Sequence, residues 1–219
     1  MVRAQAISLS LAVAPFGVTF GIAASDAGLA VWQASAFSAL VFTGSAQFAA
    51  VEIIGDGGSA VSAIVAGLLL NVRSLAFGVV MAPSLPSSRW RRALWSQLMI
   101  DETTAVGSAQ TDHAARRYGY IVTGVAVFVT WNVSTVLGAG VLGTAGDVVT
   151  RFGFDATIPA AFLALLWPRL AARDQGRAAL VGAVVALALV PVTPPGVPII
   201  AATVGVAVGW RARPGSRAS

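Results

Sequence analysis

The chain has 219 residues, of which 57% are hydrophobic and 11% are charged, and its formal net charge is +5. Soluble domains are typically about 45–50% apolar and about 25% charged, so this chain has too few charged side chains to cover a soluble globule. The composition excludes a soluble enzyme, a nucleic-acid-binding protein and a disordered chain, and it indicates a membrane protein.

Uncharged stretches of about 20 residues predict an all-α polytopic membrane protein with about six to eight transmembrane segments, some of them broken or re-entrant. We expect these segments to form a single integral membrane domain over residues 1–219. The first stretch, 4–25, is longer than the about 7–15 residues of a signal-peptide core. Ala12-Val13-Ala14 resembles a signal-peptide cleavage site, but Pro15 directly follows it. We therefore interpret this stretch as a first span.

The next three stretches carry polar residues near their centres. They are 27–51 with Gly44, Ser45 and Gln47, 59–82 with Asn71 and Arg73, and the short segment 93–110 with Asp101 and Glu102. Small residues such as Gly44 and Ser45 favour a helix break. Irregular backbone is tolerated at membrane depth only where it lines a protein cavity or water, so a break there points to a functional segment.

The C-terminal half predicts further helices. A fifth span lies within 118–146, and a sixth runs from about 156 to 172, opened by Asp155 and Pro159. Residues 178–210 are uncharged but contain four prolines, through which one helix cannot continue. We expect two short helices there, joined by a proline turn.

Arginine placement distinguishes two topologies. If all eight segments cross the membrane from a cytoplasmic N-terminus, nine arginines lie inside and four lie outside. If 27–55 and 93–110 each enter and leave on one side, twelve lie inside and Arg151 alone lies outside. The positive-inside rule favours this second arrangement, with both termini cytoplasmic. Seven or eight ordinary helices with an imperfect charge bias are the alternative.

Arg73, Asp101 and Glu102 are predicted to lie at membrane depth, where a charged side chain opposes insertion by about 2.5–3.5 kcal/mol. We therefore expect Arg73 to pair with one of the acids. The pair either locks two helices together or acts on a passenger, with the acids meeting an ammonium group or carrying a proton and Arg73 meeting a carboxylate. We favour the functional interpretation because ionisable residues at membrane depth commonly mark transport pathways.

The break at Gly44 adds a second polar group. Discontinuous helices of secondary transporters use such freed backbone to bind carboxylates and ions. The alternative is a close crossing of small residues, with Gln47 as an interhelical hydrogen bond. Our predicted substrate-binding residues are Gly44, Ser45, Gln47, Asn71 and Arg73, and the predicted proton-coupling or ion-pair residues are Asp101 and Glu102.

In order along the chain, these motifs resemble those of the AzlC-type branched-chain amino acid permeases. The matching stretches are Phe42-Thr43-Gly44-Ser45-Ala46-Gln47-Phe48, Asn71-Val72-Arg73, Asp101-Glu102, and Asp155-Ala156 followed by Pro159-Ala160. The resemblance implies a proton-driven exporter of leucine, isoleucine, valine and sometimes methionine in the bacterial cytoplasmic membrane. It also implies a small AzlD-type hydrophobic subunit as partner. This chain has Ser74 where the family commonly has histidine or a similar polar residue, which leaves the protonation chemistry less defined.

Other functions stay open on the residues alone. A passive channel for a small polar solute could use the same broken segments, and a structural subunit of a membrane complex is a further alternative. An enzyme is disfavoured, since the predicted spans hold no histidine and no nucleophile beside a base. The chain has no cysteine and a single histidine, His113, so we expect no metal and no cofactor. The expected partners are an amino acid, membrane lipid and the small subunit, with a homo-oligomer also open and nucleic acid excluded.

Overall fold

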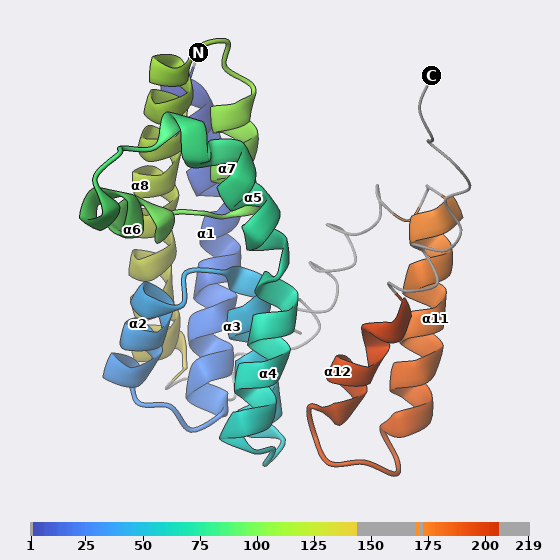
Figure 1. Ribbon diagram of the computed structural model, residues 1–219. Helices are drawn as coiled ribbons and strands as arrows, with labels where there is room; N and C mark the ends of the chain where they lie inside the picture. The colour runs from blue at the N-terminus through green and yellow to red at the C-terminus, as the bar shows by residue number, and fades with distance from the viewer. Residues whose placement is uncertain (1, 144–169, 171–172, 206–219) are drawn as a thin grey trace, which may run out of the picture.

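The computed structural model describes residues 2–143, 170 and 173–205, and the regular elements in these ranges are helices (Figure 1). They are α1 (Val2–Asp26), α2 (Val31–Leu40), α3 (Gly44–Gly55), α4 (Ala60–Asn71), α5 (Arg73–Met81), η1 (Ala82–Ser84), α6 (Arg89–Ser96), α7 (Asp101–Ser108), α8 (His113–Leu137), η2 (Gly138–Leu142), α11 (Arg173–Leu189) and α12 (Val197–Ala202). Of these described elements, α1 and α8 with η2 are long and apolar enough to cross a membrane, and the bent pair α4–α5 is a third candidate. The chain is an all-α polytopic membrane protein, as its composition predicts.

The helices α1 and α8 pack closely because small residues line their contact. A Cβ atom on Gly17 would lie 2.8 Å from the Ser134 Cβ, and one on Gly21 would overlap the Thr135 carbonyl oxygen. From the other helix, a Cβ atom on Gly138 would overlap the Val18 carbonyl oxygen. Lipid provides no hydrophobic drive for helix association, so close van der Waals packing of this kind supplies much of the attraction.

The predicted break at Gly44 is present and turns 27–55 into a re-entrant hairpin. The helix α2 ends at Leu40 and α3 begins at Gly44. The two ends of the hairpin adjoin, since a Cβ atom on Gly55 would lie 3.4 Å from the Ala27 Cβ. The segment therefore enters and leaves at one end of the bundle, with its tip near mid-depth (Figure 1).

A second break, which the sequence pattern did not predict, divides the expected span 59–82. The helices on either side of Val72 differ in direction by 42°. Neither glycine nor proline stands at the break, so no residue type signalled it. Its consequence is that Arg73 occupies the first turn of a new helix, α5.

The second re-entrant segment contains α6 and α7 and is entered from the opposite end of the bundle. The Ser84 Oγ lies 3.0 Å from the His113 Nδ1, so the chain leaves and returns at the same place. The segment 93–110, predicted to be re-entrant or broken, is broken: α6 ends at Ser96 and α7 begins at Asp101, so Asp101 and Glu102 directly follow the break.

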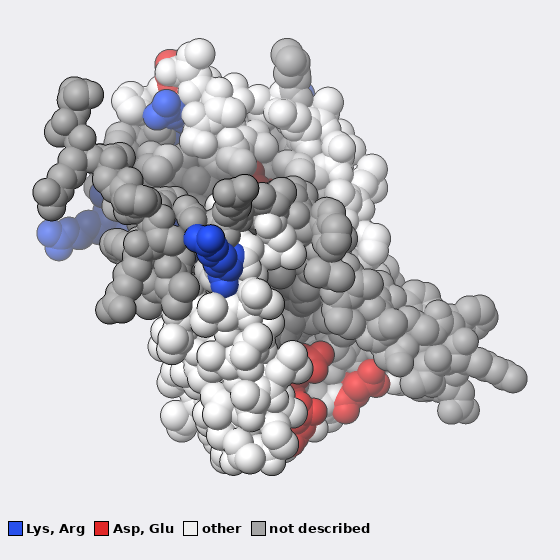
Figure 2. Space-filling model, turned by 90° about the vertical axis from the view of Figure 1, so that its right-hand side faces the viewer, with Lys and Arg blue, Asp and Glu red and all other residues white. Residues whose placement is uncertain are grey.

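The two ends of the bundle differ in charge, with arginines predominating at the end that also holds Asp112. The Arg3 Nε donates to the Tyr118 hydroxyl at 2.8 Å, which puts the N-terminus beside the start of α8. Within residues 2–143, five further arginines lie either in the re-entrant segment that starts and returns at this end or in the first turns of α8. They are Arg89, Arg91, Arg92, Arg116 and Arg117. The opposite end carries Asp26, Glu52 and Asp56, and acidic side chains gather at the lower end in Figure 2. The positive-inside rule would place the N-terminal end in the cytoplasm, and this orientation stays a prediction.

The remaining predicted elements are found in part. The fifth span begins at His113 rather than near 118, because the Asp112 carboxylate accepts hydrogen bonds from the Ala114 and Ala115 amides at 2.9 Å and caps α8. The proline turn is present between α11 and α12, as predicted. The predicted segment 156–172, apart from residue 170, and the motif that opens it lie outside the described residues.

Candidate substrate site

Three helices begin close together near the middle of the bundle, and each begins where the chain breaks (Figure 1). They are α3, which starts at Gly44, α5, which starts at Arg73, and α7, which starts at Asp101. The first backbone amides of a helix have no intrahelical partners, and the helix dipole makes that end electropositive. Three such ends in one place make a polar centre within an apolar bundle.

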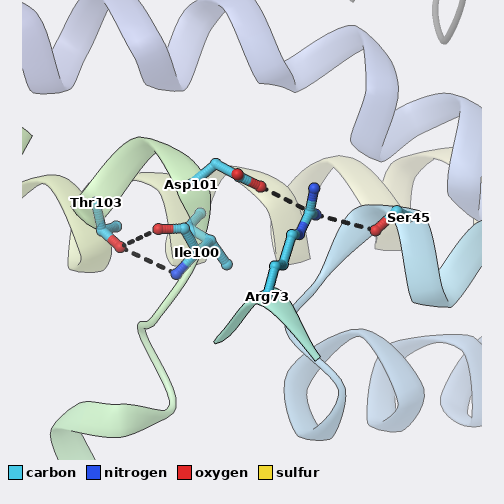
Figure 3. Close-up of polar contacts among 5 residues, drawn as sticks. All are labelled: Ser45, Arg73, Ile100, Asp101 and Thr103. Carbon is cyan, nitrogen blue, oxygen red and sulfur yellow. Dashed lines mark hydrogen bonds and ion pairs between the residues drawn. The ribbon is translucent and has the colours of Figure 1, made fainter. Parts of the chain in front are cut away.

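The side chain of Arg73 joins the three helix starts (Figure 3). Its Nη2 lies 2.9 Å from the Asp101 Oδ2 and donates to the Ser45 Oγ at 3.1 Å. The predicted pairing of Arg73 with one of the two acids is thus present, with Asp101 as the partner. Glu102, the next residue, is partly buried in the first turn of α7.

This ion pair is accessible rather than sealed. The exposed fractions of the Arg73 and Asp101 side chains are 40% and 32%. Both of these contacts use Nη2, and the guanidinium carries further N–H groups on Nη1 and Nε. A guanidinium can bind a carboxylate through two parallel hydrogen bonds. The centre can therefore receive a small ligand that carries a carboxylate.

Thr103 holds the start of α7 in place (Figure 3). Its fully buried hydroxyl accepts from the Ile100 amide at 3.1 Å and donates toward the Leu98 and Ile100 carbonyl oxygens, at 2.7 and 3.0 Å. This bonding fixes the direction in which Asp101 leaves the helix. Thr103 was not among the predicted site residues; it directly follows the acid pair and is the third residue of α7.

Gln97 connects the tips of the two re-entrant segments. Its Nε2 donates to the Ala39 and Leu40 carbonyl oxygens, at 2.8 and 3.0 Å, and these are the last two residues of α2. The amide thus satisfies carbonyl groups that a helix end leaves without partners. Gln97 was not among the predicted site residues, because its contact joins two segments that lie 57 to 58 positions apart.

Gln47 lies behind the polar centre and bridges helices. It is fully buried, its Nε2 donates to the Ser38 carbonyl oxygen at 3.2 Å, and its Oε1 accepts from the Trp131 Nε1 at 2.9 Å. This contact matches the interhelical alternative for Gln47, and a role in substrate binding stays a prediction. Gly44 packs against the same tryptophan, since a Cβ atom there would lie 3.0 Å from the Trp131 ring, which is a tight contact.

Four buried side-chain polar atoms lack a hydrogen-bond partner within the described residues; Thr123 Oγ1 lies within α8, and the other three lie at the breaks. Thr43 Oγ1, Asn71 Oδ1 and Thr104 Oγ1 are buried and have no hydrogen-bond partner within the described residues. Thr43 precedes α3, Asn71 ends α4, and Thr104 lies in the first turn of α7. Buried polar groups are normally paired, so three unsatisfied ones beside a polar centre point to a ligand that supplies the missing bonds.

Comparison with protein families gives a match to the family described as AzlC protein, over residues 8–145. That range is more than half of the chain and contains all three helix starts. The chain belongs to the AzlC family. All seven residues that the sequence analysis selected lie within the AzlC match, and membership of this family assigns the chain a role in membrane transport.

Relatives of this AzlC protein are membrane proteins. An uncharacterized membrane protein of Archaeoglobus fulgidus is 30% identical over 202 residues, which are 91% of this chain and 89% of that protein. The inner membrane protein YgaZ of Escherichia coli is 26% identical over 200 residues, 84% of this chain and 79% of YgaZ. A further uncharacterized membrane protein, from Helicobacter pylori, is 26% identical over 100 residues, 46% of this chain and 44% of that protein. No solved structure matches the chain significantly.

Proposed function

We propose that this AzlC protein is a secondary transporter that exports branched-chain amino acids, namely leucine, isoleucine and valine, with methionine as a further substrate. The observation that carries the proposal is the accessible contact of Arg73 with Asp101 and Ser45, at three helix starts inside an apolar bundle. Discontinuous helices that meet at mid-depth are the binding architecture of many secondary transporters. An amino acid brings opposite charges, which suit a centre that holds a cation and an anion.

Each residue of the centre has a chemical role in the proposal. The guanidinium N–H groups of Arg73 bind the substrate carboxylate, and the backbone amides at the start of α3 add further donors. Asp101 meets the substrate ammonium, or takes the coupling proton when Arg73 turns to the substrate. Ser45 accepts a hydrogen bond from Arg73 and so orients its guanidinium, while Asn71 supplies a buried acceptor.

The proposal includes the setting of the protein. We place it in the bacterial cytoplasmic membrane with both termini in the cytoplasm, because the described arginines at the ends of the bundle lie with the N-terminus. A small AzlD-type hydrophobic subunit is the proposed partner. Export is coupled to the proton gradient through Asp101 or Glu102.

Counterflow of labelled leucine into proteoliposomes tests the function. Vesicles preloaded with unlabelled leucine should accumulate label transiently and saturably, with the chain alone or together with the small subunit. Flux that rises linearly with concentration and never overshoots would indicate a channel. Counterflow that the small subunit supports without this chain would indicate a structural role, and either result contradicts the proposal.

Proton coupling has its own test. In vesicles with an imposed pH gradient, leucine should move against its own gradient, and an uncoupler should abolish that movement while leaving counterflow intact. Uphill movement that the uncoupler does not change would remove the proton from the mechanism but leave the substrate assignment standing.

A further inference from the structure

An apolar groove runs along α4 and ends at the polar centre. Its volume is about 390 Å³, and its walls come from α2, α3 and α4. It extends from Ala60, the first residue of α4, to Asn71, the last, and all its lining residues except Asn71 are apolar. This volume falls within the range of about 300–1,000 Å³ that is usual for small-molecule sites.

The inner end of the groove adjoins the residues that hold Arg73. Ala46 lines the groove and directly follows Ser45, which accepts a hydrogen bond from Arg73. Asn71 lines it from the other side, two residues before Arg73, and its Oδ1 is buried without a partner in the described part of the chain. The two segments that line the inner end of the groove, at Ala46 and Asn71, are therefore the segments that carry Ser45 and Arg73 of the polar centre.

We infer that the inner end of this groove, formed by Val41, Ala46, Gly67 and Asn71, receives the aliphatic side chain of the substrate and sets its selectivity. The inference rests on the proposed function and deepens it. With the substrate carboxylate on Arg73 and its ammonium group near Asp101, the hydrocarbon tail extends along the groove between α3 and α4. Binding is favoured when an apolar tail fills this space. A small side chain leaves the space empty, and a polar side chain loses its hydration there without a hydrogen-bond partner.

Gly67 controls the width of this end. A Cβ atom on Gly67 would lie 3.6 Å from the Ala46 Cβ, which is an ordinary van der Waals distance. Alanine therefore fits at position 67 without displacing protein atoms, and it occupies space that the tail would use. Valine fills more of the same space. Ala60 lines the far end of the groove, about 10 Å from Gly67 at 1.5 Å per helical residue, and offers a matched control.

The test compares Gly67→Ala, Gly67→Val and Ala60→Val with the wild-type chain, by counterflow of labelled leucine, isoleucine, valine and alanine in proteoliposomes. Changing a hydrophobic pocket by one methylene alters selectivity about 10-fold or more. We expect Gly67→Val to lower the ratio of leucine to alanine transport by about 10-fold, Gly67→Ala to shift it less in the same direction, and Ala60→Val to leave it unchanged.

The outcomes separate this inference from the proposed function. If the wild-type chain transports no branched-chain amino acid, the proposed function and the groove assignment are both wrong. If it carries leucine and both Gly67 variants keep the wild-type leucine-to-alanine ratio, the proposed function stands and the groove assignment is wrong. If Ala60→Val impairs transport as much as Gly67→Val, a lipid chain or a partner helix fills the whole groove instead. Variants that reach the membrane in wild-type amounts qualify for the comparison, and we expect Gly67→Ala to do so because its methyl group fits.

Discussion

Trp131 and Gln47, 84 positions apart, share a buried hydrogen bond of 2.9 Å from the indole Nε1 to the amide Oε1. Because Gln47 also donates to the Ser38 carbonyl oxygen, its one side chain ties α8 to both arms of the first re-entrant hairpin. The Trp131 ring in turn packs beside Phe20 and Phe48, with ring centroids 6.4 and 6.5 Å away. These contacts hold the first turns of α3 in place, so the start of that helix is fixed beside Arg73.

Replacing Gln47 tests this anchor. Gln47→Leu keeps the shape but leaves the Trp131 Nε1 buried without an acceptor, which should lower the free energy of unfolding by about 1–3 kcal/mol. Thermal unfolding in detergent, followed by circular dichroism, measures the change. Gln5→Leu is the matched control, since Gln5 is exposed on α1. Equal melting temperatures for the two variants would show that the bond does not anchor the hairpin.

Removing either partner of the ion pair should stop transport with little loss of stability. The pair is partly exposed, and exposed pairs contribute at most about 1 kcal/mol to stability. We expect Arg73→Ala and Asp101→Asn to reach the membrane normally and to abolish leucine counterflow, while Arg89→Ala retains it. The double variant Arg73→Asp with Asp101→Arg is decisive. Restored counterflow there would mean that the pair only joins helices.

Cysteine labelling tests the re-entrant topology, because the chain contains no cysteine of its own. Ser88→Cys and Thr111→Cys should react from the cytoplasmic side with a membrane-impermeant maleimide. Asp56→Cys, at the opposite end, should react from outside. Labelling of Ser88→Cys from the outside of intact cells would reject the arrangement of α6 and α7 described above.

Two neighbouring glycines should respond differently to alanine. A Cβ atom on Gly138 would overlap the Val18 carbonyl oxygen of α1, whereas one on Gly140 would meet only the Val31 side chain, at 3.7 Å. Overpacking typically lowers the free energy of unfolding by about 1–3 kcal/mol, so we expect this loss for Gly138→Ala and none for Gly140→Ala. Denaturation in detergent measures both. The same loss in both variants would point to a property of η2 itself rather than to the contact with α1.

Part of the site could be predicted from single residues. Arg73, Asp101 and Glu102 were identified because charge at membrane depth needs a partner, and the pairing of Arg73 with Asp101 is present. The break at Gly44 followed from its run of small residues. Gln97 and Thr103 could not be identified in this way, since each acts on backbone groups whose position depends on the chain path.

Composition and local pattern were sufficient to determine that this chain lies in a membrane as helices, because few charges and long apolar runs permit no other environment. They also determined which residues must avoid lipid. Only the tertiary structure decided that α3, α5 and α7 begin beside one another, that Val72 is a break, and that a groove along α4 ends at Asn71. The physical reason is that these features arise from contacts between distant segments, whose packing no single stretch of sequence encodes.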